Sequence, residues 1–166
     1  MSGRVAPAFE LPNVGPGPDP LSLADLTAEA ELVVLFFQRD YNSTACREQV
    51  ARVGKRTDGF AARDAAVAAV VPDSRDRVER WGERIDPPFP LLADPEGTVG
   101  PEYGQSVRLP VVGDWSEFLG RMPVVAVVDA RGPDPETGWT YRSRWAGDRP
   151  RTAAVLDAVD EVAESR

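Results

Sequence analysis

The chain has 166 residues, with 27 acidic and 19 basic side chains and a formal net charge of -8. It has one cysteine and no histidine, which excludes an intrachain disulfide, a multi-cysteine or histidine metal site, and any Ser-His-Asp or Cys-His mechanism. The negative charge would repel nucleic acid, and the arginine-rich, lysine-poor composition is typical of a salt-adapted or GC-rich proteome.

The length and the hydropathy pattern limit the organisation of the chain. No segment approaches the ~20 apolar residues of a membrane span, and residues 1–7 lack the apolar core of a signal peptide. We therefore expect one domain over residues 1–166, no nucleic-acid or membrane partner, and a cytoplasmic location.

Apolar runs and helical periodicities alternate along the chain. A short strand entering a helical turn is expected at residues 21–26, after a Pro- and Gly-rich start. Continuous apolar runs predict buried strands at residues 32–37, 65–71 and 123–129, and a short strand at 91–94. Helices are expected at residues 44–58, 74–84, 97–104 and 150–164, and an antiparallel strand at 139–145 after a turn at 131–134. This order predicts an α/β fold: a central mixed β-sheet with helices on both faces.

Cys46 is the chemically informative residue, because it falls where the strand at 32–37 leads into a helix. A helix start offers unpaired N–H groups and partial positive charge that stabilise a thiolate, and Arg39 and Arg47 add charge nearby. Ser43 precedes it by about one helical turn and, with Thr44, is a candidate N-cap. A lone cysteine is usually a small buried hydrophobe, but these polar, arginine-flanked surroundings favour a reactive thiol.

Five short motifs occur in an order that is similar to one known family. They are A-P-A-F-E-L-P at 6–12, L-S-L-A-D-L at 21–26, the strand at 34–37 followed by S-T-A-C at 43–46, F-P-L-L-A-D-P-E-G at 89–97 with Y-G at 103–104, and R-M-P at 121–123 followed by a strand and R-G at 131–132. Together, over roughly residues 4–147, they resemble the peroxiredoxins, the AhpC/TSA branch of the thioredoxin fold. Met122-Pro123 resembles the cis-proline of thioredoxin-like folds, although a trans proline at a strand start is equally allowed.

The resemblance implies a thioredoxin-like fold and a thiol peroxidase of the one-cysteine type. Cys46 corresponds to the peroxidatic cysteine, Ser43 to the hydroxyl that orients the peroxide, and Arg121 to the arginine that polarises the O–O bond. The implied partners are hydrogen peroxide or an alkyl hydroperoxide, an external thiol reductant (a thioredoxin-like protein or a low-molecular-weight thiol), and a second copy in a homodimer. No cofactor or metal is implied.

Two departures from the family pattern keep alternatives open. Arg39 stands where the motif has a proline, and no resolving cysteine exists, so reduction needs an external thiol or a second copy of Cys46. Arg121 is equally well interpreted as a surface charge. The alternative function is a catalytically weak thioredoxin-fold protein that senses redox state or binds partners through mixed disulfides at Cys46. Trp115 and Phe118 would supply a binding patch if exposed, although core packing is the more common fate of such residues. A purely structural domain is the third alternative.

Overall fold

The computed structural model describes residues 4–39, 44–105, 122–144 and 148–165. The strands are β1 (Arg4–Val5), β2 (Glu10–Leu11), β3 (Leu21–Ser22), β4 (Leu32–Phe37), β5 (Ala65–Val71), β6 (Leu91–Ala93), β7 (Val124–Asp129) and β8 (Glu136–Arg142). The helices are α1 (Leu23–Glu29), α2 (Thr44–Gly54), α3 (Thr57–Ala61), α4 (Arg75–Ile85), α5 (Val99–Glu102) and α6 (Thr152–Glu164).

Within these ranges, six strands form a mixed sheet in the order β1-β8-β7-β4-β5-β6, and β2 pairs with β3 in a separate ribbon. Strand β4 lies at the centre, parallel to β5 and antiparallel to β7, and every one of its residues is buried. A strand with neighbours on both edges and cover on both faces has no polar side, which is why residues 32–37 are continuously apolar.

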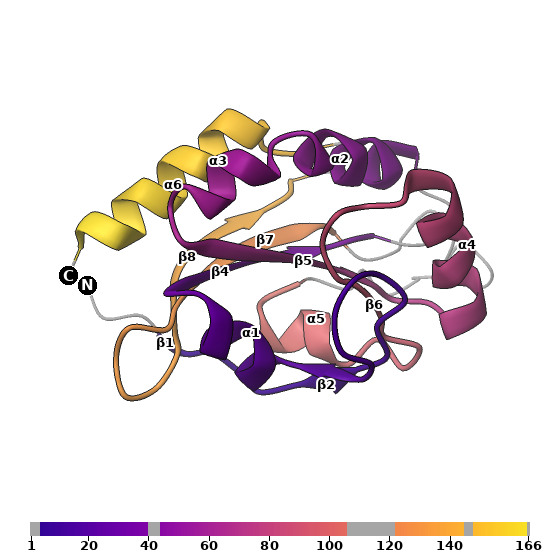
Figure 1. Ribbon diagram of the computed structural model, residues 1–166, viewed down its shortest axis with the longest axis horizontal. Coiled ribbons are helices and arrows are strands. Elements are labelled where there is room, and N and C mark those ends of the chain that lie inside the picture. The colour runs from indigo at the N-terminus through magenta and orange to yellow at the C-terminus, as the bar shows by residue number, and fades with distance from the viewer. Residues whose placement is uncertain (1–3, 40–43, 106–121, 145–147, 166) are drawn as a thin grey trace.

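The sheet separates two hydrophobic clusters. Alternate β4 residues starting with Leu32 pack with α2, α3, α4 and α6, whereas those starting with Val33 pack with α1, α5 and the β2–β3 ribbon. Figure 1 shows α2, α3 and α6 over one face of the sheet and α1, α5 and β2 over the other. The predicted fold class, a central mixed sheet with helices on both faces, is confirmed. None of the described helices has the length and apolar character needed to cross a membrane.

Several predicted element boundaries were wrong: the helix expected over residues 97–104 is the four-residue α5, and two other differences have a clear cause. The helix expected over residues 44–58 is two helices, because α2 ends at Gly54, a poor helix former, and Arg56 adopts φ -120 and ψ 20 before α3. Strand β8 starts at Glu136 rather than 139, because a bulge between the partners of Val127 and Val128 interrupts the two-residue alternation at Gly138.

Other local predictions have clear outcomes. Helix α4 begins after Ser74, whose hydroxyl accepts a hydrogen bond from Arg77 N at 3.4 Å, as expected of an N-cap. The cis peptide bond among the described residues is Asp19-Pro20, so Met122-Pro123 is trans. The expected irregular segment at 105–120, with Trp115 and Phe118, lies outside the described residues except for its first position.

Candidate active site

The thiol of Cys46 lies in the first turn of α2, below the end of β4. Cys46 is the third residue of the helix and is fully buried, in the cluster that α2 and α6 form with the sheet. The first turn of α2 carries no acidic residue, so no carboxylate on that turn opposes the partial positive charge of the helix start. The local prediction of a thiol at a strand-to-helix junction is therefore confirmed, although the side chain is more deeply buried than a reactive thiol usually is.

N–H groups of two described residues point at the sulfur. The backbone N–H of Arg39 donates to Cys46 Sγ at 3.2 Å, and the guanidinium Nη2 of Arg149 donates to it at 2.8 Å. Arg39 is the second residue after β4, whereas Arg149 comes from the segment between β8 and α6, 103 residues from Cys46 in sequence. A guanidinium and an amide N–H aimed at one sulfur stabilise negative charge on it.

The replacement of the motif proline by Arg39 has a direct consequence at the thiol. Proline has no backbone N–H, so it could not donate the hydrogen bond that Arg39 gives to Sγ. The residue that departs from the family motif thus supplies a donor that the motif residue lacks.

A network around Asp148, which we call the Asp148 latch, holds the segment that carries Arg149. The hydroxyl of Tyr141 donates to Asp148 Oδ1 at 2.7 Å, the backbone N–H of Arg144 donates to Oδ2 at 2.8 Å, and the hydroxyl of Ser143 donates to the Asp148 carbonyl. The Arg144 N–H and the Tyr141 hydroxyl lower the pKa of Asp148, and the same carboxylate raises the pKa of Tyr141. The latch fixes Asp148 to the end of β8, which positions the next residue, Arg149, over the thiol.

Three buried glutamines lie just after β4, on α2 and just after α5: Gln38, Gln49 and Gln105. Gln105 Nε2 donates to the carbonyl of Gln38 at 3.0 Å, which ties the residue before Arg39 to the segment after α5. The buried amide atoms Gln38 Oε1 and Gln49 Nε2 have no hydrogen-bond partner among the described residues. Burying such an atom costs about 1–3 kcal/mol, so both are candidates for contacts with a small polar substrate.

The candidate residues from the sequence are placed unequally. Cys46 is described, whereas Ser43 and Arg121 lie outside the described residues, so their roles stay predictions. The described cation at the thiol is Arg149, which the sequence analysis missed. One feature of the sequence could have indicated it: Arg149 lies just before the start of α6. The helix dipole disfavours a cation there, so an arginine at that position indicates a role other than helix stabilisation. The described residues contain no cluster of three or more His, Cys, Asp or Glu side chains suited to a metal ion.

The fold and the buried, arginine-contacted thiol together define a thioredoxin-fold protein of the peroxiredoxin class. A family model described as the AhpC/TSA family matches residues 2–133. This chain therefore belongs to the AhpC/TSA family, as its motifs predicted.

Solved structures agree on the fold. Peroxidoxin BcpB from Mycobacterium tuberculosis is 22% identical, with a TM-score of 0.76, over 99% of this chain and 97% of that one. Mycobacterium tuberculosis AhpC is 20% identical, with a TM-score of 0.75, over 100% of this chain and 94% of that one. A mutant of peroxiredoxin 6 from Arenicola marina is 17% identical, with a TM-score of 0.80, over 99% of this chain and 74% of that one. The comparison with curated protein sequences found no match.

Proposed function

We propose that this protein is a thiol-dependent peroxidase of the one-cysteine type that reduces hydrogen peroxide or alkyl hydroperoxides at Cys46. The observation that carries the proposal is the sulfur itself: Cys46 Sγ accepts hydrogen bonds from Arg39 N at 3.2 Å and Arg149 Nη2 at 2.8 Å. A thiolate is the nucleophilic form of cysteine, and this arrangement favours it.

The first half-reaction oxidises the sulfur by two electrons. The Cys46 thiolate attacks one peroxide oxygen, an S–O bond forms, and the O–O bond breaks. The departing oxygen takes up a proton and leaves as water or an alcohol, and Cys46 becomes a sulfenic acid. The Arg149 guanidinium stabilises the thiolate before the reaction and lies where it can donate to the oxygens that develop charge.

The second half-reaction needs a thiol from outside the chain, because Cys46 is the one cysteine in the sequence. An external thiol attacks the sulfenic sulfur, an S–S bond forms, and the hydroxyl leaves as water. A second thiol then displaces Cys46 and releases a disulfide, which regenerates the starting thiol. A thioredoxin-like protein, a low-molecular-weight thiol, or Cys46 of a second copy in a homodimer fits this role.

Two further residues complete the proposed site on the strength of the family resemblance. Ser43 precedes Cys46 by three positions and would hydrogen-bond the peroxide, and Arg121 precedes the β7 segment and would polarise the O–O bond. In this proposal Arg149, which donates to Cys46 Sγ, stabilises the thiolate, and Arg121 acts on the peroxide.

The alternative function is redox sensing or partner binding through mixed disulfides at Cys46. The sequence lacks the motif proline at position 39 and a resolving cysteine. Partner capture through Cys46 requires neither of these, so their absence favours the alternative. The burial of Cys46 argues against it as a first step, because a small peroxide requires far less opening of the site than a protein thiol does.

The test is a brief stoichiometric pulse of hydrogen peroxide on the reduced protein with a sulfenic-acid trap present, followed by intact-mass analysis, with Cys46→Ser as the control. We expect one trapped adduct per chain, formed well ahead of the adduct on a free thiol, and none on the control. Trapping no faster than on a free thiol would leave mixed-disulfide capture as the better account of Cys46.

A further inference from the structure

A pocket separate from the thiol site lies on the face of β8 that points away from α6. It is lined by residues of β1, α5, the segment after α5, and β8 (Arg4, Val5, Pro7, Pro101, Glu102, Tyr103, Gly104, Thr137, Thr140 and Arg142), and its volume is about 420 Å³. Cys46, Arg39 and Arg149 are not among the lining residues, so this pocket is distinct from the thiol site.

The strand geometry brings the polar lining together. Thr140 and Arg142 are two residues apart on β8 and therefore share a face. The bulge at Gly138 shifts the alternation, so that Thr137 joins them, whereas a Cβ on Gly138 would meet Val162 of α6 on the other side. Arg4 comes from the neighbouring strand, where it pairs with Thr137.

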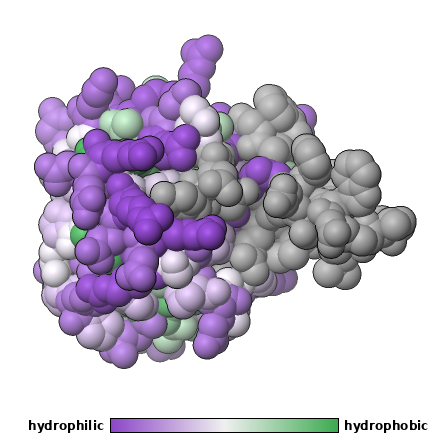
Figure 2. Space-filling model, turned by 90° about the vertical axis from the view of Figure 1, so that its right-hand side faces the viewer, coloured by the Kyte–Doolittle hydropathy of each residue, from purple (hydrophilic) through white to green (hydrophobic). Residues whose placement is uncertain are grey.

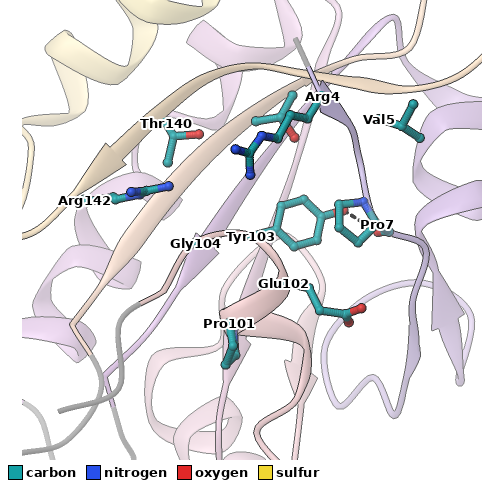
Figure 3. A pocket seen from close by; sticks show the side chains of 10 residues that line it. Arg4, Val5, Pro7, Pro101, Glu102, Tyr103, Gly104, Thr140 and Arg142 are labelled. Carbon is teal, nitrogen blue, oxygen red and sulfur yellow. Dashed lines mark hydrogen bonds between the residues drawn. The ribbon is translucent and has the colours of Figure 1, made fainter.

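The two arginines of the pocket differ from several other described arginines. Arg63, Arg75 and Arg131 each form an ion pair with an aspartate. The side chains of Arg4 and Arg142 form no hydrogen bond or ion pair with any described residue, although the chain has 27 acidic residues. Figure 3 shows both guanidinium groups extending into the pocket, toward each other. Like charges that face one space repel, and an anion between them relieves that repulsion.

Glu102 is the one acidic residue among the described residues that line the pocket. Glu102 points to the opposite side of Tyr103 from the two arginines (Figure 3). The hydroxyl of Tyr103 donates to the carbonyl of Pro7 at 2.6 Å, and burial raises its pKa, so Tyr103 stays neutral. Gly104, at φ +91, leaves room for the Arg142 guanidinium, because a Cβ there would lie 2.7 Å from Arg142 Nη2.

We propose that this pocket binds a small phosphorylated molecule, with the phosphoryl group between Arg4 and Arg142. A phosphate monoester carries close to two negative charges and several acceptor oxygens, which matches two guanidinium groups and the hydroxyls of Thr137 and Thr140. The pocket is larger than a phosphate and falls within the range of small-molecule sites, about 300–1,000 Å³. Val5, which is 63% exposed, and the two prolines offer apolar surface to the organic part.

The experiment is isothermal titration calorimetry at fixed ionic strength with phenyl phosphate, inorganic phosphate and benzoate as probes. We expect saturable binding of one phenyl phosphate, weaker binding of inorganic phosphate, which lacks the organic part, and weaker binding of benzoate, which has a single charge. Arg4→Gln and Arg142→Gln should each weaken phenyl phosphate binding about tenfold, since each removes a charge-assisted contact.

The controls separate this pocket from net charge and from the thiol site. Arg80→Gln removes the same charge from the exposed face of α4 and should leave the affinity nearly unchanged. Cys46→Ser and Arg149→Gln should bind as the wild type does, so the outcome is independent of peroxidase activity. Four results would overturn the proposal: no saturable binding, equal losses in Arg80→Gln and Arg142→Gln, loss in the thiol-site variants, or benzoate binding as tightly as phenyl phosphate. Thermal unfolding of each variant excludes misfolding as the cause of a loss.

Discussion

An arginine from outside helix α6 lies near each of its ends, and the two arginines make opposite kinds of contact. At the C-terminal end, Arg131 donates to the carbonyls of Val162 and Ala163 at 2.9 and 2.8 Å and pairs with the Asp129 carboxylate at 2.9 Å. At the N-terminal end, Arg149 donates to the sulfur of Cys46. Figure 1 shows α6 lying along the same face of the sheet as α2, which brings its start toward the thiol.

The difference shows how a structural and a functional arginine can be told apart. A cation at the C-terminus of a helix is favoured by the helix dipole, so Arg131 stabilises the fold where it stands. A cation at the N-terminus is disfavoured by the same dipole, and Arg149 is held there by the Asp148 latch. On the side of the molecule shown in Figure 2, the described surface is largely hydrophilic, whereas Cys46 is buried.

The largest expected effect comes from Arg149→Gln. Removing the guanidinium deprives the sulfur of a charged donor, and loss of one such donor typically lowers a rate about 10²- to 10³-fold. The measurement is the rate of the reduced protein with hydrogen peroxide in a stopped-flow instrument. A variant that reacts as fast as the wild type would show that Arg149 is a packing residue.

Arg131→Gln should have the reverse profile. The substitution takes the guanidinium from Asp129, which is 4% exposed, and from two carbonyls at the end of α6, so we expect a loss of about 3 kcal/mol in the free energy of unfolding. Chemical denaturation measures that loss, and the peroxide rate at a temperature where the variant is folded should equal that of the wild type. A fall in that rate without a loss of stability would contradict the comparison.

A matched pair at position 39 isolates the backbone donor. Arg39→Ala removes the side chain but keeps the N–H that reaches Cys46 Sγ, whereas Arg39→Pro restores the family motif residue and removes the N–H. If that hydrogen bond stabilises the thiolate, the proline variant should react with peroxide about tenfold more slowly than the alanine variant. Equal rates in the two folded variants would show that the N–H contributes nothing.

The Asp148 latch should give the smallest effect, and one that depends on pH. The pKa of Asp148 is lowered in the fold by the Arg144 N–H and the Tyr141 hydroxyl, so its stabilisation is present above the unfolded value of about 3.9 and is lost as the pH falls through the lower folded value. Tyr141→Phe removes one of these bonds and should cost about 1 kcal/mol at neutral pH and much less in acid. Unfolding curves at neutral pH and near pH 3 measure the difference, and a cost that does not change with pH would contradict the role assigned to the carboxylate.

The sequence predicted best what depends on local pattern. Strands β4, β5 and β7 were predicted from continuous apolar runs, with β7 starting one residue later than expected. A fully buried strand has no polar face, so its residues are apolar throughout. The start of β8 was missed because the bulge at Gly138 breaks the alternation. Strand β1 is two residues long and is fixed by pairing with β8, a partner more than 130 residues away, so its own sequence carries no pattern.

The residues of the candidate site also differ in whether local sequence or tertiary packing determines their place. Cys46 could be predicted because its strand-to-helix position is local, and the order of the motifs identified the family. Arg149 could not be predicted in this way, because the packing of α6 against the sheet brings it to the sulfur. The Asp148 latch that holds it joins Tyr141 of β8 to the segment before α6, which is a tertiary contact. The Arg4 and Arg142 pocket depends on strand pairing and a bulge, which also leave no local pattern.

The measurement that tests the central claim most directly is the second-order rate constant for hydrogen peroxide with the reduced wild-type protein, compared with free cysteine under the same conditions. If the Arg39 and Arg149 contacts activate Cys46, the protein should react at least about 10²-fold faster than free cysteine, and Arg149→Gln should lose most of that advantage. A wild-type rate no higher than that of free cysteine would contradict the account, because the contacts at the sulfur would then hold a buried thiol in place without activating it.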